Sequence, residues 1–470
     1  HLRMETRSSV VKFMPGRIRK VAKNGMVDVE LVGGDVELSR AQEDLIQGVE
    51  AGQPVEARRP QTVQLQCTSV CWNASGSSLA VSYGRTDIVG WCDFPGAVCV
   101  WTVFSRSFQP DTPDYVLDHT SCLTCVRYHP DMPALLAAGS FNGEVVVWNL
   151  NTPEKPVGIS PIDECSHKEA VMDVEWVYDS AHREFLLTSV GADGKVLFWS
   201  LSNGLQNPVR GVTLSKGKNS KRYYPSSHGG TALSFSGSSV KRRPEWLVVG
   251  QEGGGLVRGQ AARILSGPSL NAETLRTKFN VDETYTALKK GEDTFAHEPH
   301  IGPVNAIDCS PFHKRVLLTG GQDGSVRLFH MLERQPLRQW DPSPPPGTTG
   351  VTSSFGAVTC VRFSKIRPLL FAAASEEGFV YLYDIGSESP APLAMLEAPT
   401  SQATVSGRRG TSRAPFSSVA FNKKQRDLFA ACDHSGRVYI WRLGWKLANK
   451  HPTEQTVLDV FGDVQKKDDE

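Results

Sequence analysis

Residues 304–329 read VNAIDCSPFHKRVLLTGGQDGSVRLF and contain three short apolar patterns of strand length. The second and third patterns are joined by Asp323-Gly324, a pair that favours a tight turn between antiparallel strands. The first pattern ends at Cys309, and the third ends at Phe329, 20 positions later. One small sheet of this kind cannot bury both of its faces, so we expect it to pack against further copies of itself.

The same unit recurs along the chain with a constant internal spacing. The separation of 20 positions is found again from Tyr128 to Trp148, from Phe363 to Tyr383 and from Phe421 to Trp441. Two copies, ending at Trp101 and Trp199, are lengthened by loops, and a degenerate copy covers residues 231–257. Seven sheets stacked radially bury their faces and leave only short edges, so we predict an all-β protein, a seven-bladed β-propeller. Two separate β-sandwiches would not produce one fixed spacing.

The overall composition describes a globular chain. Among 470 residues there are 51 basic and 50 acidic ones, with 40% hydrophobic residues and a formal net charge of +1. Balanced charge gives no general attraction to nucleic acid, so we expect no nucleic-acid partner. Apolar runs such as 369–374 are far shorter than the roughly 18 residues of a membrane span, so we expect no membrane insertion. The chain begins at His1 without a visible secretory signal, which predicts a reducing compartment and an incomplete amino terminus.

Motifs for catalysis or metal binding are missing from the sequence. It contains no phosphate-binding loop, no nucleophile elbow and no His-Glu-x-x-His zinc motif. Cys122 and Cys125 lack a second pair at metal-binding spacing, and the ten cysteines lie mostly in apolar runs, as free core thiols do. Carboxylates such as Asp173, Glu175 and Asp308 occur singly on strand patterns. We therefore predict no enzyme, no catalytic residue, no cofactor and no metal, with a grafted catalytic site as a remote alternative.

We divide the chain into an N-terminal extension (1–60), the propeller (61–445) and a C-terminal tail (446–470). The extension begins as a flexible basic arm, and a capping pattern from Ser39 predicts a short amphipathic helix at about 40–50. Alternating patterns at 26–32 and 62–70 predict strands. One of these two, or the segment after Trp441, must supply the outer strand of the last blade, because a closed ring leaves no blade incomplete.

Four insertions leave the repeat pattern. We expect loops at 201–230, 341–357 and 397–415, and a loop with a short helix at 259–303. The first insertion carries Lys216, Lys218 and Lys221, which form either a solvated loop or a basic face for an acidic partner.

The repeats resemble WD repeats. In that family a histidine before the first strand, an aspartate in the turn between the second and third strands, and a tryptophan ending the third form a hydrogen-bonded network within the blade. His167, Asp193 and Trp199 occupy these positions in one copy; His300 and Asp323 do so in another, where Phe329 replaces the tryptophan. We predict a structural role for the whole set: His119, Trp148, His167, Asp193, Trp199, His300, Asp323, Asp433 and Trp441.

Two strings of residues carry a more specific resemblance. CWNASG at 71–76 and RPLLFAAAS at 367–375 resemble the propeller of dynein intermediate chains, most nearly those of intraflagellar-transport (cytoplasmic type two) dynein. The resemblance covers residues 66–442. It implies a non-catalytic motor subunit in retrograde intraflagellar transport, whose propeller binds the dynein heavy-chain tail. It also implies dynein light chains, a second intermediate chain and transport-train proteins as partners, and a location in the cytoplasm, the cytoskeleton and the cilium or flagellum, including axoneme and basal body.

The same resemblance suggests where a light chain would bind. Light-chain grooves of this family accept an extended strand around a Gln-Thr core, which makes Gln61 and Thr62 the candidate contact. Pro60 removes a backbone donor beside them, which argues against the assignment. Two alternatives stay open for the whole chain. One is an axonemal dynein intermediate chain, and the other is a general WD-repeat adaptor, such as a ubiquitin-ligase substrate receptor or a chromatin scaffold.

Overall fold

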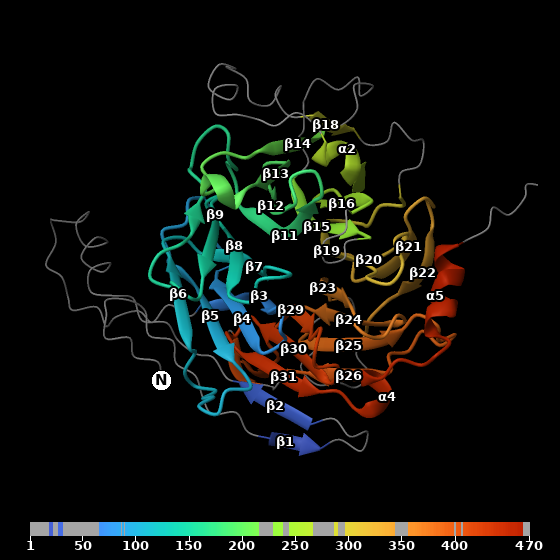
Figure 1. Cartoon of the computed structure of the whole chain (residues 1–470). Coiled ribbons are helices and arrows are strands. Elements are labelled where there is room, and N and C mark those ends of the chain that lie inside the picture. Colours follow the sequence, from blue (N-terminus) through green and yellow to red (C-terminus); the bar gives the residue numbers. More distant parts are fainter. Residues whose placement is uncertain are drawn as a thin grey trace, which may run out of the picture.

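The chain forms a ring of β-sheets around a central channel (Figure 1). The computed structural model describes residues 18–21, 27–31, 65–85, 87–88, 90–215, 229–237, 244–266, 286–289, 297–343, 356–398, 401–405 and 408–463. Within these residues, seven sheets are the blades of a β-propeller, as the repeat spacing predicts. The first strand of each blade faces the channel and contacts the first strands of both neighbouring blades.

Blades 1 to 4 follow one another in chain order. Blade 1 consists of β3 (Gln66–Trp72), β4 (Ser78–Gly84), β5 (Gly96–Thr102) and β6 (Tyr115–His119). Blade 2 consists of β7 (Leu123–Tyr128), β8 (Leu135–Ser140), β9 (Val145–Asn149) and β10 (Gly158–Ile159). Blade 3 consists of β11 (Val171–Asp179), β12 (Glu184–Gly191), β13 (Lys195–Trp199), β14 (Arg210–Ser215) and the parallel strand β18 (Thr286–Lys289), with the 3-10 helix η1 (Leu201–Asn203) after β13. Blade 4 consists of β15 (Gly230–Ser236), β16 (Trp246–Gln251) and β17 (Leu256–Gln260), followed by helix α2 (Ala261–Leu265).

Blades 5 to 7 complete the ring. Blade 5 consists of β19 (Val304–Cys309), β20 (Val316–Gly321), β21 (Val326–His330) and β22 (Pro336–Trp340). Blade 6 consists of β23 (Val358–Phe363), β24 (Leu370–Ser375), β25 (Phe379–Asp384) and β26 (Ala394–Glu397). A hairpin of β27 (Ser401–Val405) and β28 (Arg408–Ser412) precedes blade 7, which consists of β29 (Phe416–Phe421), β30 (Leu428–Asp433), β31 (Val438–Arg442), β2 (Val27–Leu31) and β1 (Ile18–Val21). Helices α4 (Trp445–Ala448) and α5 (Glu454–Gly462) follow blade 7.

The amino-terminal part of the chain closes the ring. Strand β2 pairs antiparallel with β31, from Val27 opposite Arg442 to Leu31 opposite Val438, and β1 pairs with β2. Of the three candidates for the outer strand of the last blade, the pattern at 26–32 therefore forms that strand. Its pairing satisfies the backbone hydrogen-bonding groups at the outer edge of β31. The division of the chain into three parts stays a prediction; in the structure β2, which comes from the predicted extension 1–60, is a strand of blade 7. Residues 40–50, the site of the predicted helix, lie outside the described residues.

A β-bulge recurs in the inner strand of every blade. The register shifts by one residue near the start of each of the seven strands, as between Val304 and Ala306 in blade 5. In four blades the side chain at the bulge donates a hydrogen bond to a main-chain oxygen of the next blade. These bonds are Thr124 to Val171, Thr231 to Val304 (2.6 Å), Asn305 to Val358 (3.0 Å) and Thr359 to Phe416 (2.6 Å). The extra residue at the bulge thus directs a polar side chain toward the main chain of the next blade.

Small residues in the second strands let the blades approach one another. Strand β24 contains three consecutive alanines, and all six of its residues are buried. At the end of β20, a Cβ added to Gly320 would lie 2.6 Å from Val358 Cγ1 of the next blade, so glycine is required there. Gly324, in the turn after β20, has a φ of 77°, a left-handed conformation that glycine adopts without steric cost.

Three segments differ from what the sequence suggested or add to it. Residues 397–415, expected as a loop, contain the β27–β28 hairpin, whose Thr404 and Val405 favour strand geometry. The insertion 259–303 contains the short helix α2, and strand β18 extends blade 3. The expected tail, 446–470, contains α5 and all of α4 except Trp445, and α5 is anchored by the buried Leu458 against the core of blades 5 and 6.

Candidate functional site

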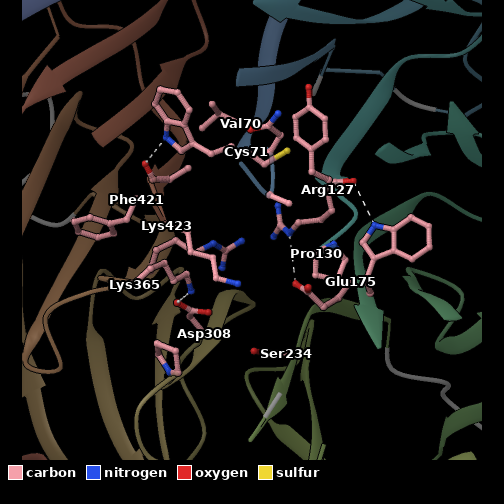
Figure 2. Close-up of a pocket in the computed structure, with 18 of the residues that line it drawn as sticks. Val70, Cys71, Arg127, Pro130, Glu175, Ser234, Asp308, Lys365, Phe421 and Lys423 are labelled. Atoms are coloured by element: carbon pink, nitrogen blue, oxygen red, sulfur yellow. Dashed lines mark hydrogen bonds and ion pairs between the residues drawn. The ribbon is translucent and has the colours of Figure 1, made fainter. Parts of the chain in front are cut away.

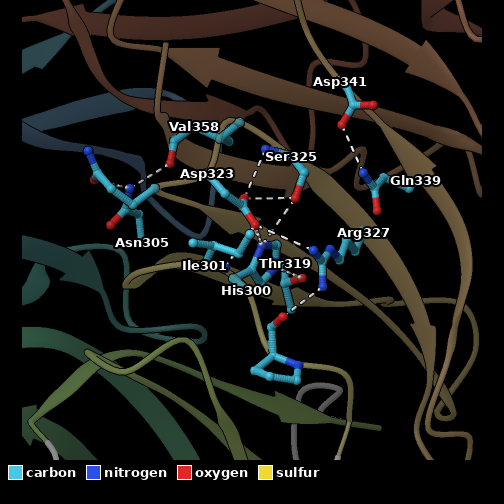
Figure 3. A network of polar contacts seen from close by, with 12 residues as sticks. His300, Ile301, Asn305, Thr319, Asp323, Ser325, Arg327, Gln339, Asp341 and Val358 are labelled. Atoms are coloured by element: carbon cyan, nitrogen blue, oxygen red, sulfur yellow. Dashed lines mark hydrogen bonds and ion pairs between the residues drawn. The ribbon is translucent and has the colours of Figure 1, made fainter. Parts of the chain in front are cut away.

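A histidine–aspartate network holds blade 5 together (Figure 3). His300 contacts Asp323 through Nδ1 (3.0 Å) and Thr319 through Nε2 (2.8 Å). The carboxylate of Asp323 also accepts hydrogen bonds from the main-chain N–H groups of Ile301 (3.1 Å) and Ser325 (3.1 Å). Burial by itself would raise the pKa of Asp323, but the hydrogen bonds from His300, Ser325 and Ile301 outweigh it and lower the pKa well below its usual value.

Blade 3 contains the corresponding chain of contacts with a tryptophan at its end. His167 Nδ1 lies 3.0 Å from Asp193 Oδ1, and its Nε2 lies 2.8 Å from Ser189 Oγ. Trp199 Nε1 donates to the same Ser189 Oγ (2.8 Å), so His167, Asp193 and Trp199 are brought together through a serine. Ser189 is not among the predicted network residues; its sequence signal is a hydroxyl residue ten positions before the closing aromatic, which Thr319 repeats in blade 5.

The order Ser189, His167, Asp193 matches the residue types of a hydrolase triad, but its surroundings argue for a structural role. Ser189 is fully buried and His167 is 1% exposed. The serine oxygen also accepts the indole N–H of Trp199, and a nucleophile needs access to a substrate carbonyl. The three side chains therefore bind the second and third strands of the blade to the segment before the first.

The remaining predicted network residues have different partners. His119 Nδ1 lies 3.1 Å from the main-chain N of Ser121, and its ring meets Trp148 edge-on at a centroid distance of 6.5 Å. In blade 7, Asp433 accepts a hydrogen bond from the hydroxyl of Tyr439 (2.8 Å), and the Tyr439 ring stacks on Trp441. Tyr439 thus links Asp433 to Trp441, whereas the sequence has no histidine nine positions before Phe421, where the other networks have theirs.

Helices α4 and α5 are fixed by one buried arginine. Arg367 opens the string RPLLFAAAS, and its Nε donates to Glu454 Oε1 of α5 (2.8 Å). Its Nη2 lies 3.0 Å from Asp384 Oδ2, and its Nη1 donates to the main-chain oxygen of Lys446 in α4 (2.8 Å). One guanidinium therefore joins blade 6 to both C-terminal helices, using its planar fork of donors.

A cavity of about 330 Å³ occupies one end of the central channel (Figure 2). All seven blades line it, through the ends of their inner strands and the loops that join first and second strands. Aromatic side chains, among them Trp72, Trp176 and Phe421, form part of its wall. The indole N–H of Trp72 is already engaged, since it donates to the main-chain oxygen of Ala420 in the neighbouring blade (3.2 Å).

Charged side chains of neighbouring blades meet in this cavity. Arg127 of blade 2 lies 3.2 Å from Asp173 and 3.6 Å from Glu175, both of blade 3. Burial raises the pKa of Glu175, although the charge of Arg127 opposes the shift. Asp308 of blade 5 reaches into blade 6. The carboxylates that occur singly in the sequence are thus paired across blades.

Asp308 accepts a hydrogen bond from the main-chain N–H of Phe363 (2.6 Å) and lies 3.4 Å from Lys365 Nζ. The cations of this cavity are not among the predicted site residues. The available signal was a charged residue just before the aromatic or cysteine that ends an inner-strand pattern, as in Arg127 and Arg362. In a strand whose other residues are apolar, such a position faces the channel.

Several predicted features lie where the structure gives no description. Gln61 and Thr62, the candidate light-chain contact, and Lys216, Lys218 and Lys221 are outside the described residues. Within the described part of the chain, no group of histidines, cysteines and carboxylates could hold a metal ion. Over the same residues, no helix is both long and apolar enough to pass through a membrane.

Comparisons with known proteins agree with the repeat architecture. The family model "WD domain, G-beta repeat" matches residues 112–149 and 291–330, which contain strands of blades 2 and 5. The structure and this match define a WD-repeat β-propeller protein.

The relatives are dynein subunits. The chain is 31% identical over 418 residues to cytoplasmic dynein 2 intermediate chain 2 of Homo sapiens, covering 84% of this chain and 69% of the relative. It is 22% identical to the cytoplasmic dynein 1 intermediate chain of Drosophila melanogaster, covering 81% of this chain and 49% of that protein. It is 24% identical to dynein axonemal intermediate chain 1 of Bos taurus, covering 59% and 36%. The chain belongs to the dynein intermediate chain family.

Proposed function

We propose that this chain is a non-catalytic intermediate chain of the dynein that drives retrograde intraflagellar transport. The observation that carries the proposal is the 31% identity to a cytoplasmic dynein 2 intermediate chain over 84% of the chain, against 22% and 24% for the dynein 1 and axonemal relatives. In this role the propeller binds the tail of a dynein heavy chain. The region before it engages light chains and pairs with a second intermediate chain, and transport-train proteins bind the assembled motor.

The geometry supports a scaffold and not a catalyst. The blade networks of His167 and His300 are buried and hold strands together. Bonds such as those of Thr231 and Thr359 lock the blades to one another, which suits a platform that must keep its shape under load. The ATPase that moves the motor resides on the heavy chain in this proposal, and the chain acts in the cytoplasm and in the cilium, at the basal body and along the axoneme.

Two other functions compete with this one. An axonemal intermediate chain would serve ciliary beating, and the 24% identity to an axonemal relative supports that alternative to a lesser degree. A general adaptor, such as a ubiquitin-ligase receptor, would share the propeller but not the 31% identity to a dynein intermediate chain over 84% of the chain.

The test is to purify the tagged full-length chain from ciliated cells and to identify its partners by quantitative mass spectrometry. Recovery of a dynein 2 heavy chain with light chains and transport-train proteins supports the proposal. Recovery of inner-arm or outer-arm heavy chains would move the chain to the axoneme. Ligase or chromatin partners without any dynein chain would refute the motor function. An unrelated tagged WD-repeat propeller, purified in parallel, controls for proteins that bind propellers in general.

A further inference from the structure

The cavity of the central channel contains more cations than carboxylates. Its lining includes four cations and two carboxylates: Arg127, Arg362, Lys365 and Lys423 against Glu175 and Asp308. The carboxylates are already used, because Glu175 faces Arg127 and Asp308 faces Lys365 (Figure 2). Arg362 and Lys423 form no ion pair within 4 Å with a described carboxylate; Glu175 acts on Arg362, and Asp131 on Lys423, only through longer-range charge interactions.

The guanidinium of Arg362 is held in place by one of its nitrogens, which leaves the other N–H donors available. Its Nη1 donates to the main-chain oxygens of Ile307 (3.1 Å) and Val361 (3.2 Å), which fixes its position between blades 5 and 6. Its Nε and Nη2 donate to none of the described residues. These two N–H groups form the planar fork that binds a carboxylate with two parallel hydrogen bonds.

Lys423 brings a second positive charge into the same space. It lies on the exposed loop after β29, and its side chain also contributes to the cavity lining. Partial burial lowers the pKa of Lys423, the charges of Lys424 and Lys365 lower it further, and the charge of Asp131 opposes the shift without reversing it. Like charges held this close repel one another, so an anion placed among them would be stabilised.

We propose that this cavity is the docking site for an acidic segment of a partner protein, one Asp or Glu side chain of which pairs with Arg362 and Lys423. A volume of about 330 Å³ suits one or two side chains and not a folded domain. The exposed loop beside it carries two further cations, Lys424 and Arg426, which can meet acidic residues that flank the inserted one. Charge complementarity over several residues favours a peptide segment above a small anion. This inference goes beyond the proposed function, because it fixes the chemistry of the partner whichever complex the chain joins.

Zero-length cross-linking of the native complex tests the proposal. A carbodiimide joins a lysine amine directly to a carboxylate that it touches, and mass spectrometry then identifies both residues. The full-length chain carries its own positive control, since Lys314 Nζ lies 3.0 Å from Glu245 at an exposed position and should be joined to it. We expect Lys423 to be joined to an Asp or Glu of another protein in the complex.

Two results would overturn the inference. The first is that Lys423 stays unmodified while the Lys314–Glu245 link forms; the second is that Lys423 is joined to a carboxylate of its own chain, such as Asp131. Co-purification of a dynein heavy chain is scored separately, so failure here is distinguishable from failure of the proposed function.

A pair of variants measures the contribution of the charge. Lys423→Gln should weaken binding of the cross-linked partner about tenfold, because a charge-assisted hydrogen bond is lost from a partly buried site. Lys314→Gln removes a charge of the same kind from the same loop face and should leave that binding unchanged. Equal effects of the two substitutions would show a diffuse charge effect, and inhibition of partner binding by inorganic phosphate alone, at equal ionic strength, would identify a small-anion site instead.

Discussion

Replacing Arg367 by methionine should release helices α4 and α5 from the propeller. The change keeps much of the apolar stem of the side chain but removes every hydrogen bond to Glu454, Asp384 and the main chain of Lys446. The side chains of Arg367 and Glu454 are 8% and 5% exposed, so the carboxylate left behind would be buried without its charge partner. Breaking a buried ion pair from one side costs about 3 to 5 kcal/mol.

This loss of stability can be observed either in global unfolding or in local detachment of the helices. If the helices stay docked, the free energy of unfolding of the whole propeller should fall by about 3 to 5 kcal/mol. If they detach first, the loss is confined to α5, and its amide protection against hydrogen exchange should drop roughly 10²- to 4 × 10³-fold. Urea denaturation and hydrogen exchange followed by mass spectrometry, applied to the same sample, distinguish these outcomes.

An exposed ion pair provides the matched control. Arg442 lies 3.2 Å from Asp427, but the two side chains are 63% and 38% exposed. Arg442→Met should therefore change stability by less than about 1 kcal/mol, because solvent screens such a pair. Unchanged exchange in α5 and an unchanged denaturation curve for Arg367→Met, or an equal loss in both variants, would refute the assignment of Arg367 as the clamp of the C-terminal helices.

Three further predictions concern single positions in the blades. Trp199→Ala should lower the unfolding free energy by about 3 to 5 kcal/mol, because it leaves a cavity and removes the hydrogen bond to Ser189. Trp199→Phe, which places in blade 3 the residue type found in blade 5, should lower it less. Urea denaturation measures both variants. Met172→Thr should raise stability by about 0.5 to 1.5 kcal/mol if the new hydroxyl donates to the main-chain oxygen of Gly230, as the bulge threonines of other blades do; a lower stability would contradict that reasoning. Burial lowers the pKa of His129 to about 4 from a usual value of 6.5, so its contribution to folding stability is complete above pH 6.5 and is lost as the pH falls toward 4. The His129→Asn variant should therefore lose less unfolding free energy than the parent protein between pH 7 and pH 4.5. Equal pH dependence of the two unfolding free energies would exclude His129 as a cause.

The propeller itself was predictable because its signal is periodic. Turn pairs such as Asp323-Gly324 and closing aromatics such as Phe329 recur at a fixed spacing, and each is dictated by backbone geometry within one blade. The strand at 26–32 could be recognised as a strand, but its place in blade 7 depends on a pairing between residues some 400 positions apart, which no local pattern encodes.

The contacts between blades were not predictable for a related reason. The alternation pattern places Thr231 and Thr359 near the start of strands, but only the bulge reveals that their hydroxyl groups reach the next blade. Arg367 could be singled out within a string of residues, yet its partners Glu454 and Asp384 come from separate elements. The cavity needs all seven inner strands at once, and its balance of charges emerges only when the ring is closed.

The pairing of β2 with β31 also determines when blade 7 can be completed during synthesis on the ribosome. Strand β2 ends at Leu31, and its partner in β31 begins at Val438, so the ribosome must add roughly 400 residues before the two can meet. At about 5 to 20 residues per second, this interval lasts roughly 20 to 80 seconds. During that time the first six blades can fold as an open arc, while β2 has not yet met β31. Anything that binds β2 in this interval would leave the outer edge of β31 unpaired, although β29 can still contact β3.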